Sequence, residues 1–338
     1  MASNACSRRT SSAAAHVTSV ITIAMAACQP AFGQTRADLR EYPVKPIRFV
    51  VGFPPGGGND TIARMVGQKL SERLGQTIVI DNRAGAGGVV AGELAAHAPP
   101  DGYTMLMMSS SLTIQRLIRK DLRYDPIRDF IGVARLAAYR SVLVAHPSVA
   151  ATSVRELIAL AKAKPGALNF ASSGYAVGSH LAGELFKIAA HVDITHVPYK
   201  GTAPASSDLI SGRVQLMFAP VVPLLPHVQS GRLRALAVTS SSHSRVMPEL
   251  PTISEAGVPG YEFVGWYGIV VPVRTPRHLI EQLNAGVLEV MQSRDITARL
   301  DVEDMEFERA TPDAFNAMRA AEVAKWEKIF RQVPVNVE

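Results

Sequence analysis

Short apolar segments alternate with helix-like segments along most of this chain, and glycine-rich turns join one to the next. Residues 47–51, 77–81 and 104–108 have the β-branched and apolar character of buried strands. The strand at 47–51 leads through a glycine loop into residues 62–74, whose apolar side chains recur at helical spacing. This alternation predicts an α/β fold with largely parallel sheets. In such sheets ligands bind beyond the carboxyl ends of the strands, where loops and helix starts converge.

Four of the strand-to-helix turns are rich in glycine, serine and proline. They read PPGGG at 54–58, NRAGAGG at 82–88, ASSGYAVGS at 171–179 and PYKGTAP at 198–204. A helix that begins in such a loop presents unpaired N–H groups and the positive end of its dipole, so an anion is the expected guest. Phosphate fits poorly, because the Walker pattern needs Lys and then Ser or Thr after its last glycine, and here Asn59 and Asp60 follow Gly58. Asp60 is expected to cap the helix, and its charge favours a carboxylate over a multiply charged phosphate.

The first 33 residues have the features of an export signal. Arg8 and Arg9 precede an apolar stretch at 17–27, and AFG at 31–33 is a small-x-small cleavage pattern. The sequence therefore predicts a signal peptide over residues 1–33 and a mature protein in the periplasm. The segment MAAC that ends at Cys28 offers an alternative, which is lipid attachment at this cysteine.

The rest of the chain lacks side chains that several classes of function require. Both cysteines, Cys6 and Cys28, fall within the leader, which excludes disulfides, thiolate nucleophiles and cysteine metal sites from the mature protein. Loss of the leader lowers the formal net charge from +6 to +4, and aromatic residues make up only 6% of the chain. No nucleic-acid surface is therefore expected. His191 and His196 are not spaced as in the H-E-x-x-H zinc arrangement, so no metal site is predicted.

Several segments together resemble one known family. They are YPVKPIRFVVGFPPGGGNDTIAR at 42–64, DNRAGAGG at 81–88, THVPYKGTAPA at 195–205 and LPTISEAGVPGYE at 250–262. The chain resembles the Bug family, the periplasmic solute-binding proteins of tripartite tricarboxylate transporters, over essentially its whole mature length. The resemblance implies a type II periplasmic-binding fold in which two lobes, each a mostly parallel sheet flanked by helices, close on a small carboxylate. It also implies a monomer that is not an enzyme, needs no cofactor and delivers its ligand to membrane permease subunits.

The resemblance also implies where the two lobes begin and end. The first lobe would be discontinuous, over residues 44–141 and 265–338, and the second would span residues 142–264. The two crossings between them, near 138–144 and 263–268, would form the hinge. A C-terminal helix with Phe315, Met318, Trp326 and Phe330 on one stripe would return to the first lobe.

In the family, backbone amides, hydroxyls and bound waters hold most of the ligand's carboxylate oxygens, and matching positions exist here. On the first lobe they are Pro55, Gly56, Gly57 and Gly58, with Ser109 and Ser110 at the neighbouring strand end. On the second lobe they are Ser172, Ser173, Gly174, Ser179, Gly201, Thr202 and Ala203. A site of neutral donors accepts a carboxylate without burying an opposing charge.

Two departures from the family pattern bear on the ligand. Tyr175-Ala176 stands where relatives commonly carry Asn-Gly, so the loop can follow another path and Tyr175 can narrow the site. Ala219-Pro220 stands where many relatives show an acidic residue and an amide, so a partner for a ligand ammonium group is missing. We therefore expect a di- or tricarboxylate or an aromatic acid rather than an amino acid. The sequence leaves open whether Tyr175 and Lys200 contact the ligand.

Two other functions stay open at the level of sequence. A sensor would use the same closing lobes to signal to a membrane protein, and no sequence feature separates it from a transport receptor. An exported hydrolase would need a nucleophile and a base, but no G-x-S-x-G elbow surrounds a serine of the candidate loops. Trp266 and Tyr267, near the second crossing, are candidates either to contact the ligand or to wedge between the lobes.

Overall fold

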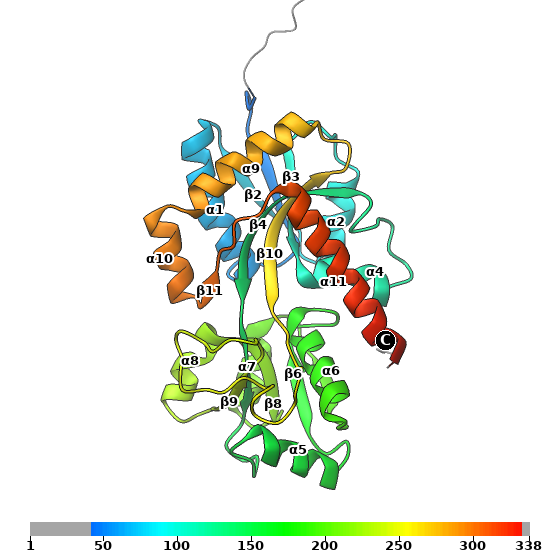
Figure 1. Ribbon diagram of the computed structural model, residues 1–338, viewed down its shortest axis with the longest axis vertical. Helices are drawn as coiled ribbons and strands as arrows, with labels where there is room; N and C mark the ends of the chain where they lie inside the picture. The colour runs from blue at the N-terminus through cyan, green and yellow to red at the C-terminus, as the bar shows by residue number, and fades with distance from the viewer. Residues whose placement is uncertain (1–41, 333–338) are drawn as a thin grey trace, which may run out of the picture. The chain divides into compact units, whose positions relative to one another are not determined.

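The computed structural model describes residues 42–332. The predicted signal peptide at 1–33 and the alternative lipid site at Cys28 lie outside these residues. The described chain forms two sheets with helices packed against them, which confirms the predicted α/β class (Figure 1). Within residues 42–332, no helix combines the length and the apolar character needed to cross a bilayer.

The first sheet has six strands in the order β11-β4-β10-β3-β1-β2. Strands β1 to β4 run in one direction, while β10 and β11 run in the opposite one. Its strands are β1 (Ile47–Val51), β2 (Ile78–Asn82), β3 (Thr104–Ser109), β4 (Phe130–Tyr139), β10 (Gly265–Pro272) and β11 (Met305–Glu306). The helices from the same stretches of chain are α1 (Gly58–Leu74), η1 (Ala86–Gly88), α2 (Val89–Ala96), α3 (Ser110–Thr113), α4 (Gln115–Ile118), α9 (Arg277–Met291), α10 (Arg294–Val302) and α11 (Pro312–Gln332).

The second sheet has five strands in the order β7-β6-β8-β5-β9, of which only β5 runs against the others. Its strands are β5 (Ser141–Ala145), β6 (Asn169–Ser172), β7 (Thr195–Pro198), β8 (Leu216–Pro220) and β9 (Arg234–Val238). The helices α5 (Val154–Ala163), α6 (Gly178–Ala190), α7 (Thr202–Ile210) and α8 (Val221–Gln229) belong to this part of the chain.

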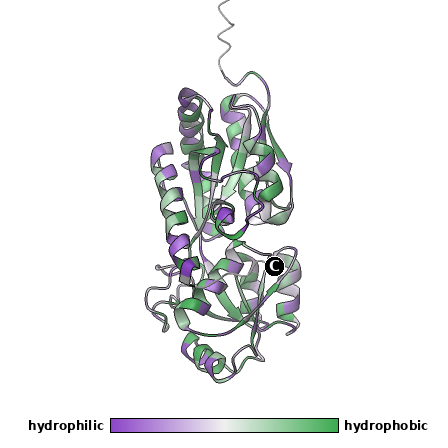
Figure 2. Ribbon diagram, turned by 90° about the vertical axis from the view of Figure 1, so that its right-hand side faces the viewer, coloured by the Kyte–Doolittle hydropathy of each residue, from purple (hydrophilic) through white to green (hydrophobic). Residues whose placement is uncertain are grey.

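The central strands are buried on both faces, which explains their continuous apolar sequences. Every residue of β5 and every residue of β10 is buried, as expected where helices cover both sides of a sheet. Figure 2 shows mostly apolar colours in the interior of both sheets and a mixture of apolar and polar colours along the helices. The packing fixes the orientation of each strand, and with it the edge of the sheet at which its loops emerge.

Two passages carry the chain between the sheets. Strand β4 ends at Tyr139 and β5 begins at Ser141, so Arg140 alone separates a strand of the first sheet from a strand of the second. The return passage leads into β10 at Gly265, and just before it the N–H of Phe263 donates to the carbonyl of Thr239, 2.8 Å away, beside the second sheet. Crossings near 138–144 and 263–268, and the hinge that they would form, stay a prediction.

Helix α11 contacts both parts of the molecule. Near its start, Phe315 packs edge-on against Trp266 of β10, with 5.3 Å between ring centroids. Near its end, Trp326 packs edge-on against Phe263 at 6.2 Å and shares a hydrophobic cluster with Leu181 of α6. The sequence predicted a return to the first lobe, and the structure shows that this helix also lies against the second.

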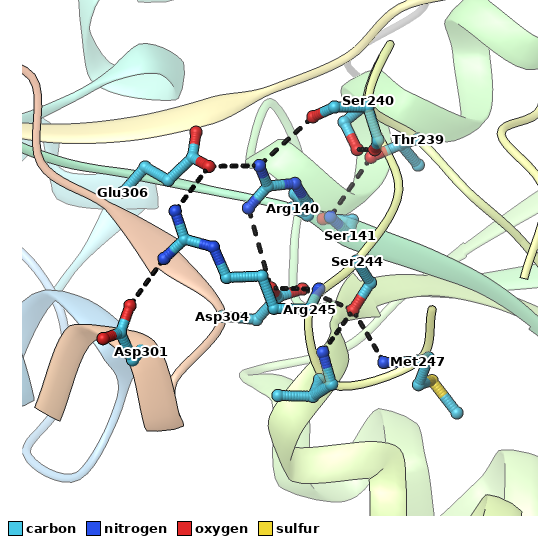
Figure 3. A network of polar contacts seen from close by, with 12 residues as sticks. Arg140, Ser141, Thr239, Ser240, Ser244, Arg245, Met247, Asp301, Asp304 and Glu306 are labelled. Carbon is cyan, nitrogen blue, oxygen red and sulfur yellow. Dashed lines mark hydrogen bonds and ion pairs between the residues drawn. The ribbon is translucent and has the colours of Figure 1, made fainter. Parts of the chain in front are cut away.

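A polar network surrounds Arg140 at the first passage (Figure 3). The Arg140 guanidinium donates to Glu306 of β11 at 2.7 Å and to the hydroxyl of Ser242 at 3.1 Å, and it lies 3.6 Å from the carboxylate of Asp304. Asp304 is fully buried and accepts from the Ser244 hydroxyl at 2.7 Å and from the Arg245 N–H at 3.0 Å.

The side chain of Arg245 completes this network by pairing with Glu306 at 3.0 Å and with Asp301 of α10. Asp301, Asp304 and Glu306 lie in and around α10 and β11 of the first lobe, whereas Ser244 and Arg245 follow β9 of the second sheet. The network is therefore a direct polar connection between the two lobes.

Candidate functional site

The loop between β1 and α1 is organised by Asp60, which lies in the first turn of α1. Its buried carboxylate accepts from the N–H of Gly56 at 2.9 Å, from Arg64 Nε at 3.0 Å and from Asn82 Nδ2 at 2.9 Å. Burial opposes ionisation of Asp60, but the hydrogen bonds from Arg64, Gly56 and Asn82 outweigh it and lower the pKa. Asp60 thus holds the loop in shape, and the N–H of Gly56 is engaged with it rather than turned to a ligand.

The start of α1 is left without a side-chain cap within the described chain. Gly57 is the residue before the helix and makes no side-chain cap, and Pro55, Gly56, Gly57 and Gly58 are all exposed. Gly58 is packed against the hydroxyl of Tyr267 so closely that a Cβ at this position would overlap it. The hydroxyl of Tyr267, in β10, therefore lies beside the first residue of a helix whose first-turn N–H groups have no side-chain cap.

The predicted serines of the second lobe bind one another. The N–H of Ser173 donates to Ser179 Oγ at 3.0 Å, and Ser172 Oγ donates to the carbonyl of Gly174 at 2.7 Å. The N–H of Gly201 donates to the carbonyl of Ser173 at 3.1 Å, which joins the loop before α7 to the loop before α6. The structure thus brings Ser172, Ser173, Gly174, Ser179 and Gly201 into one cluster, where several of their donors are used within the cluster itself.

Unused donors in the second lobe lie at the helix starts. Neither Val177, before α6, nor Gly201, before α7, caps its helix with a side chain. The first residues of these helices are Gly178 and Thr202, followed in α7 by Ala203. Together with α1, three long helices of the described chain begin uncapped in the loops where the ligand was predicted, and each contributes N–H donors and a dipole that favours an anion.

The loop before α6 holds Ala176 in a conformation that alanine rarely adopts. Its φ is +57°, in the left-handed region, and its N–H donates to His180 Nδ1 at 3.0 Å. Tyr175-Ala176 was expected to allow a different path from relatives with glycine at the second position. The structure keeps a glycine-like conformation there, with His180 as its support.

Two stacked histidines pack against Tyr175 of this loop. The rings of His180 and His196 lie 3.9 Å apart, and Tyr175 meets both of them edge-on, at 6.0 and 5.3 Å. Burial lowers the pKa of His180 to about 3 and that of His196 to about 4. Both imidazoles are therefore neutral at neutral pH and add no charge to the site.

Ser172 and His196 have the spacing of a nucleophile and its base, because Ser172 Oγ lies 2.6 Å from His196 Nε2. The serine is completely buried, however, and its oxygen is also bonded to both the carbonyl and the N–H of Gly174. This serine has the environment of a loop-stabilising residue.

The loops of the two lobes approach each other at Gly87 of η1. The Tyr175 carbonyl lies 3.5 Å from the position that a Cβ would take on Gly87, whose own carbonyl accepts from Gln115 Nε2 at 3.3 Å. Among the described residues, the buried Gln115 Oε1 and Ser110 Oγ have no partner in good hydrogen-bond geometry. Ser109, by contrast, caps α3 by accepting from the N–H of Leu112 at 3.3 Å.

The acidic side chains near the candidate loops are already paired. Glu184 of α6 binds Lys187 at 3.0 Å, and Asp208 of α7 binds Arg213 and Tyr199, both at 2.8 Å. Lys200 is exposed on the loop before α7. Within residues 42–332, no three histidines, cysteines or carboxylates are grouped so that they could hold a metal ion.

An open cavity of about 420 Å³ lies elsewhere, between β4, β11 and α10. It is lined by arginines and acids that pair with each other, such as Arg135 with Glu308 and Arg245 with Asp301. The candidate loops are chemically different, since their hydroxyls and uncapped helix starts are neutral donors, and the one carboxylate at the first loop, Asp60, is already hydrogen-bonded.

The sequence did not single out one residue that lies close to these loops. Tyr139, the last residue of β4, stacks on Tyr267 with 4.8 Å between ring centroids, and its hydroxyl lies 2.8 Å from where a Cβ would sit on Gly178. In the sequence Tyr139 looks like one more member of an apolar strand. The glycine at the start of α6 was the one available signal that a bulky group approaches it.

A model of the family described as "Tripartite tricarboxylate transporter family receptor" matches residues 62–335. Among curated proteins, the chain is 38% identical over 304 residues to a protein encoded in the tcbD-tcbE intergenic region of Pseudomonas sp. strain P51, covering 89% of this chain and 90% of that protein. It is 36% identical over 293 residues to Protein BugT of Bordetella pertussis, covering 86% and 90%.

Two solved structures of relatives contain carboxylic acids. R. palustris Rpa4515 with adipate has a TM-score of 0.80 and 37% identity, covering 86% of this chain and 97% of that one. MatC from Rhodopseudomonas palustris with bound malate has a TM-score of 0.78 and 31% identity, covering 85% and 99%. These similarities confirm the two-lobed periplasmic-binding fold.

Proposed function

Because the chain belongs to the family of tripartite tricarboxylate transporter receptors, we propose that it captures a small carboxylate between its lobes in the periplasm and delivers it to the permease subunits of such a transporter. The coarser part of this role, solute binding rather than catalysis, is the one shared with its relatives.

One observation carries the proposal: α1 of one lobe and α6 and α7 of the other begin uncapped in loops without a free carboxylate. Helix starts from two lobes can hold the two ends of a dicarboxylate, since each offers N–H donors and a favourable dipole. Pro55, Gly57, Gly58, Thr202 and Ala203 lie at these starts and are the proposed contacts, with Ser110 beside them.

The proposed ligand is a di- or tricarboxylate, or an aromatic acid, without an amino group. An α-ammonium group would need an acceptor, and Asp60, Glu184 and Asp208 are each paired already. A buried cation without a partner is strongly disfavoured. The acids in the two related structures, adipate and malate, also lack an amino group.

A thermal-shift screen tests the ligand class directly. The panel should contain succinate, adipate, malate, citrate and benzoate, with glutamate and aspartate as the amino-acid arm. A ligand at a hundred times its Kd stabilises the folded state by about 2.7 kcal/mol, which corresponds to a shift of several degrees. Tight binding of glutamate or aspartate with no response to the other acids would refute the proposed class.

A charge placed at the start of α7 tests the location. Thr202→Asp puts a carboxylate at the first residue of that helix, and we expect it to weaken binding of the acid from the screen at least tenfold. Thr311→Asp is the matched control, because Thr311 caps the start of α11 by accepting from the N–H of Ala314 at 3.2 Å. Equal effects of the two substitutions would contradict a site at α7.

Delivery to a transporter needs a cellular assay. In the source bacterium, deletion of this gene should abolish uptake of the radiolabelled acid, and the wild-type chain but not the Thr202→Asp variant should restore it. Uptake that persists in the deletion strain, while the purified protein binds the acid, would argue for a role other than delivery.

A further inference from the structure

Tyr139 and Tyr267 form a buried pair where the two hinge strands lie side by side. Their rings are nearly parallel, with an angle of 24° between the planes, and they are 8% and 4% exposed. Tyr139 is opposite Gly265 in the sheet, and a Cβ on Gly265 would overlap the Tyr139 ring. A glycine at position 265 therefore leaves room for the Tyr139 ring to pack over the neighbouring strand.

Each hydroxyl of the pair reaches the start of a helix from a different lobe. The Tyr267 hydroxyl lies against Gly58, the first residue of α1, and the Tyr139 hydroxyl lies against Gly178, the first residue of α6. Both helices are uncapped by side chains. Two phenols thus lie between two helix starts that favour an anion, and glycine is needed at both starts to make room for them.

Both phenols are protonated at neutral pH. Burial raises the pKa of each of them. The pKa of Tyr139 is about 12, so its hydroxyl keeps its proton at neutral pH. A protonated phenol is a hydrogen-bond donor, so Tyr139 can offer this proton to an acceptor.

A second hydroxyl beside Tyr139 also lacks a good acceptor. Ser110 is 1% exposed, and its Oγ is close enough to Tyr139 to lower the pKa of that phenol. Within the described chain it nevertheless makes no hydrogen bond of good geometry. A buried hydroxyl without a partner is costly in a folded protein and calls for an occupant that supplies one.

We propose that the Tyr139 hydroxyl donates a hydrogen bond to one carboxylate of the bound ligand, with Ser110 as a second donor, beside the start of α6. Tyr267 acts as a positioning residue, because its ring stacks on the ring of Tyr139. This inference rests on the proposed function and adds a specificity determinant to it: two hydroxyl donors bind an ionised carboxylate more strongly than a neutral amide, because hydrogen bonds to a charged acceptor are stronger.

Calorimetry with adipate and malate tests this assignment on the full mature protein. Tyr139→Phe removes only the hydroxyl, and we expect it to raise the Kd of the acid that binds at least tenfold. Tyr124→Phe is the matched control, since the Tyr124 hydroxyl is equally buried and without a partner in the described chain, but belongs to a loop before β4. It should leave the Kd within twofold.

A second readout separates ligand contact from a structural effect. The wild-type protein should bind the diacid better than the corresponding monoamide, and Tyr139→Phe should reduce that ratio as well as the affinity. A variant that merely loosens the hinge would weaken both ligands equally, which would overturn the assignment. If Tyr139→Phe does not fold, Ser110→Ala decides, with the same loss of discrimination expected.

The outcomes distinguish failure of the proposed function from failure of the Tyr139 assignment. If the wild-type protein binds no acid, the proposed function fails. If it binds adipate or malate and the Tyr139→Phe variant binds it equally well, the proposed function stands and the assignment of Tyr139 is wrong.

Discussion

Replacement of Asp304 by Asn should destabilise the protein by about 3 kcal/mol, because this carboxylate is the buried centre of the network between the lobes. Asp304 is 1% exposed, and it faces the guanidinium of Arg140, which is 6% exposed. Removing one partner of a buried ion pair costs about 3–5 kcal/mol, since the remaining charge loses its compensation. Glu306 still pairs with Arg140 at 2.7 Å, which places the expected value at the lower end of that range.

Asparagine isolates the charge from other effects. The backbone of Asp304 has a φ of +51°, and asparagine tolerates this left-handed conformation nearly as well as aspartate. The amide oxygen can still accept from the N–H of Arg245 or from Ser244. The substitution therefore removes the carboxylate charge while keeping the shape of the turn and part of its hydrogen bonding.

Urea denaturation of the ligand-free protein measures the effect, with Asp301→Asn as the control. Asp301 pairs with Arg245 in the same network, but its side chain is 63% exposed, so its loss should cost less than about 1 kcal/mol. An Asp304→Asn variant within 0.5 kcal/mol of wild type, or equal to Asp301→Asn, would refute the view that the buried carboxylate stabilises the connection.

Three further substitutions have clear expected results. Ala176→Gly should raise the free energy of unfolding by about 1 kcal/mol, because alanine at a φ of +57° is strained and glycine is not. If urea denaturation shows no such gain, then the loop holds alanine without strain. Glu322 accepts from Trp266 Nε1 at 2.6 Å, and burial of its carboxyl raises the pKa to about 7 from 4.5. The stability that this proton gives is present below pH 4.5 and is lost as the pH rises through 7. The free energy of unfolding of Glu322→Gln, relative to that of the wild type, should therefore grow by up to about 3 kcal/mol over that interval. A difference that does not change with pH would contradict the raised pKa. Gly58→Ala should lower the free energy of unfolding by about 2 kcal/mol, because the added methyl group overlaps the Tyr267 hydroxyl. Adding Tyr267→Phe to this variant should recover at least half of the loss. If the two substitutions instead lower the stability additively, then the two residues do not collide.

The sequence was sufficient for the fold class and for the loops, because both depend on local patterns. Apolar runs and helical spacing predicted β1 and α1, and glycine-rich turns predicted the loops that lead into α1, α6 and α7. It was not sufficient for the direction of individual donors. The N–H of Gly56 turns to Asp60 and that of Ser173 turns to Ser179, and such choices depend on loop conformation rather than on composition.

Long-range contacts account for what the sequence could not supply. Arg140 and Asp304 are far apart in the chain and lie together because β11 pairs with β4. Likewise, the glycine at 58 could be explained by the turn alone until Tyr267, from β10, was found against it. A local pattern predicts that a residue must be small, and only the assembled sheets show which group it makes room for.

Tyr139 and Arg140, the residues that carry the proposed ligand contact and the connection between the lobes, are neighbours in the sequence. Successive residues of an extended chain point to opposite sides; accordingly, Tyr139 reaches the start of α6, while Arg140 reaches Asp304 and Glu306. The ligand contact proposed for Tyr139 and the connection between the lobes therefore share one segment of backbone. A ligand shifts an equilibrium between open and closed lobes only if it interacts differently with the two arrangements. The Tyr139 hydroxyl comes from a strand of the first sheet and lies beside the start of α6, so it is placed to make that difference.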